Sequence, residues 1–146
     1  MSTHLHRADQ FKSLLAETRT IAAVGVCCDP ACAAYYVPEY LYHEGFRIVP
    51  VSTKHLGMRM WGEPVRTTLA DIREPVDVVC IFRGAGLPHQ LIDDVFAMKY
   101  RPSTVWFPPG TEHAQFGARL VAAGLDVVED RCMAAEHKCA GLSVFG

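Results

Sequence analysis

The 146-residue chain lacks several features that would define its class at once. No apolar run approaches the ~20 residues that a membrane-spanning helix needs, so we expect no membrane span. The formal net charge is only −2 and 50% of the residues are hydrophobic, which argues against disorder and against general nucleic-acid binding. The N-terminal segment MSTHLHRADQFKSLLAE has no apolar core of a signal peptide, which favours a cytoplasmic location. Linkers and internal repeats are also absent, so we predict a single domain spanning residues 1–146.

Metal-binding and catalytic patterns are missing too. The six cysteines include no C-x-x-C pair, and the adjacent Cys27 and Cys28 do not suit one tetrahedral zinc site. None of the seven histidines has an i, i+4 partner or stands beside a serine or cysteine in a recognisable triad order. Asp93 and Asp94 fit solvated helix positions. We therefore predict no metal site and no catalytic residues, and we interpret the cysteines as free thiols.

The most informative segment is Thr20–Asp29, with the sequence TIAAVGVCCD. Its small and β-branched apolar residues suit a strand buried on both faces, as in a parallel sheet. Gly25 stands where this strand should end, and an amphipathic helix pattern begins near Ala33. A strand, a glycine, a short loop and a helix form the corner that binds phosphate in nucleotide-binding α/β domains.

The rest of the chain alternates between helix and strand patterns. Helices are expected at Asp9–Glu17, Ala33–Glu44 (with Pro38 in its first turns), Leu87–Met98 and Glu112–Ala123. Strands are expected at Ile21–Val26, Phe46–Val51, Val76–Phe82, Thr104–Phe107 and Asp126–Glu129, with short helical turns at Thr68–Ile72 and near Ala134–His137. This alternation predicts a Rossmann-like, doubly wound α/β fold, with a five-stranded, mainly parallel sheet and helices on both faces. The ligand crevice of such a sheet lies beyond the carboxyl ends of its strands.

The corner residues also restrict the ligand. A dinucleotide site would have three glycines after the first strand and an acidic residue at the end of the second. Here the loop reads GVCCDP and the second strand ends in PVSTK, so NAD fits poorly. Ser52, Thr53 and Lys54 offer hydroxyls and a cation that suit a phosphorylated ribose. The P-loop pattern is missing as well, so triphosphate hydrolysis is not expected.

The segments VGVCCDP, YYVPEYL, GFRIVPVS, TLADIREPVDVVCIF and VVEDRCMAAEH, in this order, resemble the small stand-alone CoA-binding proteins. That family is a Rossmann-like domain related to the CoA-binding domain of succinyl-CoA synthetase, and the resemblance runs from Thr20 to His137. It implies that the chain binds CoA or acyl-CoA, or a related adenine nucleotide, with the ADP portion over the loop after the first strand. Because no catalytic constellation is visible in the residues, we predict non-catalytic binding. The ligand-lining residues that the resemblance implies are Gly25, Val26, Pro30, Val37, Pro50, Val51, Phe82, Arg83, Trp106 and Cys132. Cys27, Tyr36, Ser52 and Lys54 complete the set of candidate CoA-binding residues.

The loop departs from the family pattern at positions that would contact phosphate. The family usually has a serine where Cys27 stands, and a basic residue and a serine near Cys32 and Ala34. Backbone amides, Lys54 and Arg83 remain to hold the phosphates. Two alternatives stay open: a subunit of an acyl-CoA synthetase or transferase, and a thiol-based redox or metal-responsive protein on a nucleotide-binding fold. The sequence identifies no protein partner.

Overall fold

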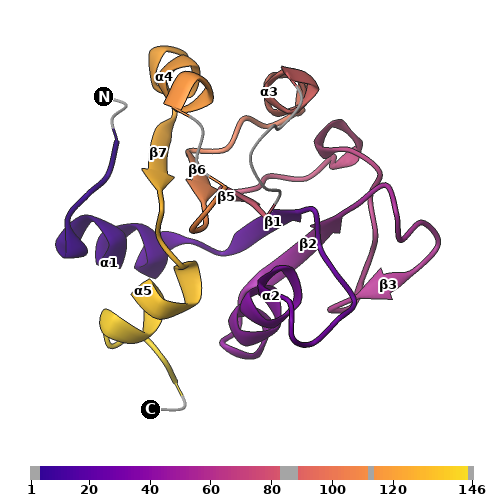
Figure 1. The fold of residues 1–146 in the computed structure, drawn as a ribbon, viewed down its shortest axis with the longest axis horizontal. Helices are drawn as coiled ribbons and strands as arrows, with labels where there is room; N and C mark the ends of the chain where they lie inside the picture. Colours follow the sequence, from indigo (N-terminus) through magenta and orange to yellow (C-terminus); the bar gives the residue numbers. More distant parts are fainter. Residues whose placement is uncertain (1–3, 83–88, 112–113, 145–146) are drawn as a thin grey trace.

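A five-stranded parallel sheet runs through the molecule in the order β2-β1-β5-β6-β7 (Figure 1). The computed structural model describes residues 4–82, 89–111 and 114–144. The strands are β1 (Thr20–Val24), β2 (Arg47–Val51), β5 (Val78–Ile81), β6 (Thr104–Phe107) and β7 (Asp126–Glu129). This topology confirms the predicted Rossmann-like α/β fold.

Helices cover both faces of the sheet (Figure 1). Helices α1 (Ala8–Glu17), α2 (Ala33–His43) and α5 (Met133–Cys139) lie on one face, and α3 (His89–Ala97) and α4 (Ala114–Ala122) lie on the other with the 3-10 turn η1 (Leu69–Asp71). Successive strand residues alternate between the two layers, because side chains in a strand point to opposite faces. Ile21 and Ala23 pack with α1 and α2, whereas Ala22 and Val24 pack with α3 and α4.

The boundaries of several elements differ from the sequence prediction. Strand β1 ends at Val24 and not at Val26, because Gly25 turns the chain with a φ of 81°. The tail forms the full helix α5 instead of one turn. A short antiparallel hairpin, β3 (Arg59–Met60) and β4 (Glu63–Pro64), occupies a segment for which the sequence predicted neither a helix nor a strand. Strands of this length are too short to produce a recognisable hydrophobic period.

Each edge of the sheet carries an isolated bridge. At the β2 edge, Arg66 pairs with Val51 in parallel: its N–H donates to the Pro50 carbonyl, and its carbonyl accepts from the Ser52 N–H, both at 2.9 Å. The Arg66 guanidinium also contacts Glu63 at 3.0 Å and Glu74 at 2.9 Å. At the β7 edge, His4 bridges to Val127. The pairing of Arg66 with β2 fixes the residues that follow it, 67–69, beside the end of that strand.

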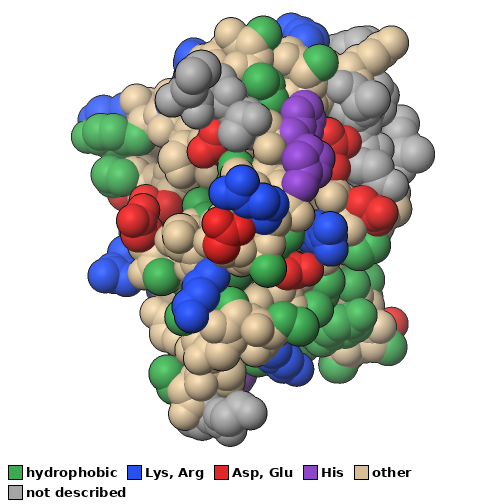
Figure 2. Space-filling model, turned by 90° about the vertical axis from the view of Figure 1, so that its left-hand side faces the viewer, with side chains coloured by type: hydrophobic (Ala, Val, Ile, Leu, Met, Phe, Trp, Pro, Cys, Tyr) green, Lys and Arg blue, Asp and Glu red, His purple; other side chains and the backbone are tan. Residues whose placement is uncertain are grey.

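The face of the molecule that carries α1 has mixed charge. Figure 2 shows the side of the molecule on which α1 lies, where acidic and basic side chains are interspersed. None of the helices in the described residues is long and apolar enough to cross a bilayer.

Candidate functional site

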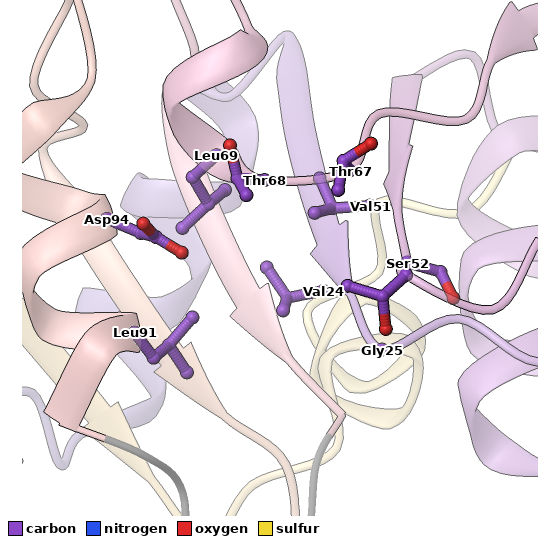
Figure 3. Close-up of a pocket in the computed structure, with 10 residues that line it drawn as sticks. Val24, Gly25, Val51, Ser52, Thr67, Thr68, Leu69, Leu91 and Asp94 are labelled. Atoms are coloured by element: carbon purple, nitrogen blue, oxygen red, sulfur yellow. The ribbon is translucent and has the colours of Figure 1, made fainter. Parts of the chain in front are cut away.

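A cavity of about 150 Å³ lies at the carboxyl ends of β1 and β2 (Figure 3). Strand β1 pairs with β2 on one side and with β5 on the other. The strand order therefore reverses at β1: β2 is added on one side of it and the later strands on the other. Ligands of doubly wound sheets bind at such a reversal. The cavity is lined by Val24, Gly25, Val51, Ser52, Thr53, Thr67, Thr68, Leu69, Leu91 and Asp94.

Gly25 forms the floor of this corner. Its φ of 81° is in the region that glycine adopts readily and residues with a side chain rarely do. Its N–H donates to the Val51 carbonyl at 2.8 Å, which ties the start of the loop to the end of β2. The backbone at this point of the cavity is therefore fixed in place and carries no side chain of its own.

The loop after Gly25 is anchored to α2 through a proline. Pro38 lies in the interior of α2 and not in its first turns, contrary to the expectation from the sequence. It has no N–H to donate to the Ala34 carbonyl four residues earlier. That carbonyl instead accepts the Cys27 N–H over 3.4 Å. The proline thus frees an acceptor that holds the loop against the start of the helix.

Hydroxyl groups form one side of the cavity and aliphatic groups form another. Ser52 is only 6% exposed, and its Oγ accepts the backbone N–H of Lys54 at 3.1 Å. Thr67 and Thr68 come from the segment that Arg66 fixes to the edge of β2. In Figure 3, Leu69, Leu91 and Val24 project from three different elements toward the same space. This arrangement suits a flat, partly apolar ligand group with polar atoms on its edge.

Asp94 is a cavity residue that the sequence analysis placed in solvent. It lies on α3 and is half-buried at the cavity. Burial raises the pKa of its carboxyl group, and the nearby charges of Asp93 and Asp71 raise it further. Its position three residues after Leu91, on the same side of the helix, is the signal that could have identified it. Its carboxylate can accept a hydrogen bond from a ligand amino or hydroxyl group.

We expect Asp94→Asn to increase the free energy of unfolding slightly at pH 7. The raised pKa means that the folded state holds the proton more tightly, so the carboxyl group destabilises the fold increasingly as pH rises through its titration range. The gain should disappear below about pH 3, where the carboxyl is protonated in both states. Urea unfolding at several pH values measures this difference. The control Asp9→Asn should not increase the free energy of unfolding, because the hydrogen bond from the Arg7 guanidinium lowers the pKa of that exposed carboxyl. Equal increases at both positions would contradict the explanation.

A thiol from the loop after Gly25 meets an imidazole from the segment after β2. The Sγ of Cys28 lies 3.6 Å from Nδ1 and 3.9 Å from Nε2 of His55, and Cys28 is exposed. The two residues are 27 positions apart, so the sequence order gave no sign of the contact. Within the described residues, no group of three or more His, Cys, Asp and Glu side chains could hold a metal ion.

The structure brings together part of the predicted ligand-binding set. The members that line the cavity are Gly25, Val51 and Ser52. The members that are buried and do not line it are Val26, Val37, Pro50 and Trp106. The members that are wholly or partly exposed and do not line it are Cys27, Pro30, Tyr36, Lys54, Phe82 and Cys132. Arg83 lies outside the described residues.

Trp106, one of the predicted ligand-lining residues, lies in the hydrophobic core. It is 0% exposed, and its ring lies 5.7 Å from that of Phe11. Its indole N–H donates to the Arg131 carbonyl at 2.6 Å. The side chain therefore has no surface to offer a ligand in this structure.

Comparisons with known proteins agree with the fold. A family model described as a CoA binding domain matches residues 19–138. A Thermus thermophilus protein, described as cell-free ID.343, is 36% identical, with a TM-score of 0.87 over 92% of this chain and 99% of that one. A hypothetical protein from Pyrococcus horikoshii OT3 is 26% identical, with a TM-score of 0.84 over 92% of both chains.

Proposed function

Because this chain belongs to the CoA-binding domain family, we propose that it binds CoA or an acyl-CoA at the cavity between β1 and β2 and releases it chemically unchanged. The observation that carries this proposal is the cavity itself, which combines hydroxyl groups with the partly exposed backbone of Gly25 at the point where the strand order reverses. At about 150 Å³ it is smaller than a typical pocket for a whole small-molecule ligand. It therefore encloses only one end of the ligand.

We assign the adenosine end of CoA to this cavity. The adenine ring would lie between the aliphatic side chains of Leu69 and Leu91, with Asp94 and the hydroxyl groups of Ser52 and Thr67 at its polar edge. The pyrophosphate would follow the backbone after Gly25 toward the N-terminus of α2, where helix amides favour negative charge. Lys54 follows the cavity residues Ser52 and Thr53 and supplies a cation for the ribose phosphate.

The side chains of the cavity support binding without turnover. A covalent or acid–base step needs a nucleophile or acid in hydrogen-bond contact with a suitable partner. Among the described residues that line the cavity, the Ser52 hydroxyl accepts a backbone N–H, and no hydroxyl is paired with a general base. The cavity is thus equipped to hold a ligand.

Calorimetric titration with CoA, NAD and ATP tests this function. We expect CoA to bind most tightly, because its ribose phosphate can use Lys54. Lys54→Ala should weaken CoA binding up to roughly tenfold and reduce its salt dependence, since an exposed charge is screened by salt. Lys99→Ala, which removes a cation near Tyr100, is the matched control. It should change neither the affinity for CoA nor the salt dependence of that affinity. Equal or tighter binding of NAD would contradict the assignment of CoA.

The contact between Cys28 and His55 supports a second candidate function, a thiol-based redox response. An imidazole within hydrogen-bond reach of a thiol can act as its general base when the thiol reacts. We expect Cys28 to be alkylated by iodoacetamide faster than Cys139, which is also exposed. His55→Gln should slow the reaction of Cys28 and leave that of Cys139 unchanged, as measured by mass spectrometry of the labelled peptides. Equal rates at both cysteines would argue against a thiol function.

A further inference from the structure

A groove separate from the cavity runs between α2 and the β3–β4 hairpin. Its volume is about 520 Å³, within the range of small-molecule pockets. It is lined by Cys28, Tyr35, Glu39, Tyr42, Met58, Arg59, Met60, Trp61 and Gly62. Tyr42 and Met58 are 40% and 44% exposed, so the groove is open to solvent and presents large apolar groups to it.

Trp61 occupies a backbone conformation that a bulky residue seldom adopts. Trp61 and Gly62 connect β3 to β4 with φ values of 53° and 77°. Two-residue hairpin turns with positive φ at both positions strongly prefer Asn-Gly or Gly-Gly, because only small residues adopt this region easily. Strained residues of this kind are concentrated at ligand-binding sites. The turn therefore keeps a tryptophan where the backbone disfavours one.

The Trp61 side chain is fixed as a wall of the groove. Its indole N–H donates to Oε1 of Glu39 at 3.3 Å, and its ring centroid lies 5.8 Å from that of Tyr35. The carboxylate of Glu39 also accepts a hydrogen bond from the Tyr35 hydroxyl, which raises the pKa of Tyr35. Glu39 lies 3.2 Å from His43 as well. This network holds two aromatic rings and a carboxylate in a defined arrangement facing an open groove.

The groove begins where the proposed pyrophosphate site ends. Cys28 belongs to the loop after Gly25 and also lines the groove. It contacts His55 at 3.6 Å, and His55 lies two residues after the cavity residue Thr53. A ligand whose phosphates lie on this loop can therefore extend from the cavity into the groove without leaving the surface.

From these observations we propose that the groove binds the pantetheine arm of CoA and the first carbons of an attached acyl chain. This inference rests on the proposed function. Pantetheine alternates apolar carbons with amide groups: the aromatic and methionine side chains would cover the carbons, and the Glu39 carboxylate can accept an amide N–H. The ligand class is thus CoA or its acyl thioester in preference to a nucleotide without the arm.

Titrations of the whole chain with adenosine 3′,5′-bisphosphate, CoA and hexanoyl-CoA test the groove. Trp61→Gly removes the ring and gives the hairpin a turn that its backbone favours, so the variant should fold. We expect it to bind CoA and hexanoyl-CoA roughly tenfold more weakly, while the bisphosphate, which lacks the arm, binds within about twofold of the unmodified protein. Tyr100→Ala removes another exposed aromatic side chain, 44% exposed and outside the groove, and should alter none of the affinities.

The outcomes separate this inference from the proposed function. If the unmodified protein binds none of the three ligands, the proposed function fails and the inference fails with it. If CoA binds but Trp61→Gly leaves its affinity unchanged, or weakens CoA and bisphosphate equally, only the groove assignment is overturned. Fluorescence of Trp61 in a Trp106→Phe background provides a second measurement. CoA and hexanoyl-CoA should change this emission and the bisphosphate should not; no change with CoA would overturn the inference.

Discussion

Gly25→Val is expected to abolish CoA binding, with an affinity loss of at least about 100-fold, or roughly 3 kcal/mol. A branched side chain at this position would project from the backbone over which the pyrophosphate is proposed to lie. It would also disfavour the φ of 81° that directs the loop away from β1. Calorimetric titration with CoA measures the loss of binding, and thermal unfolding followed by circular dichroism establishes that the variant is folded.

Gly45→Val is the matched control for this experiment. Gly45 follows the end of α2 with a φ of 99°, and a Cβ there would meet no atom within 4 Å. Because of this φ, valine at position 45 would meet the same kind of backbone strain as valine at position 25, but away from the cavity. Both variants should be less stable than the unmodified protein, and only Gly25→Val should lose CoA binding. A folded Gly25→Val protein that binds CoA normally would place the site elsewhere on the domain.

Trp106→Ala is expected to lower the free energy of unfolding by about 3–5 kcal/mol, the usual loss for a large aromatic side chain deleted from a core. Trp106 is fully buried, and its deletion would also leave the Arg131 carbonyl without its 2.6 Å hydrogen bond. Urea unfolding measures the change. Trp61→Gly is the control at the other tryptophan, and it should change stability far less because Trp61 is only partly buried. A loss under about 1 kcal/mol at Trp106 would contradict its assignment to the core.

The fold could be predicted because buried parallel strands and amphipathic helices leave strong sequence patterns. The limits of that signal are visible at Val26, which is only 4% exposed but lies beyond the end of β1. An apolar pattern reports burial, whereas the extent of a strand depends on its hydrogen bonds. The β3–β4 hairpin was missed for a related reason. Its strands have two residues each, and its turn carries Trp61 where asparagine or glycine would have signalled it.

Only part of the candidate site could be predicted from the sequence. Gly25 and Ser52 were identifiable because the ends of parallel strands meet at one edge of a sheet. Thr67 was not, because tertiary packing alone brings its segment to that edge, and for Asp94 the only sign was its helical spacing from Leu91. Thr67 is positioned by the pairing of Arg66 with β2 and Asp94 by the packing of α3. The contact between Cys28 and His55 likewise depends on how separate loops converge.

The bridges at the two sheet edges also bear on whether copies of the chain aggregate. An open strand edge presents unpaired N–H and C=O groups that can recruit a strand from another molecule. Here Arg66 occupies part of the outer edge of β2, next to a proline with no amide hydrogen, and His4 occupies part of the outer edge of β7. Since Arg66 also positions the cavity residues that follow it, a substitution that released this segment would do more than disturb ligand binding. It would uncover a strand along which copies of the chain could pair, and so link loss of the site to loss of solubility.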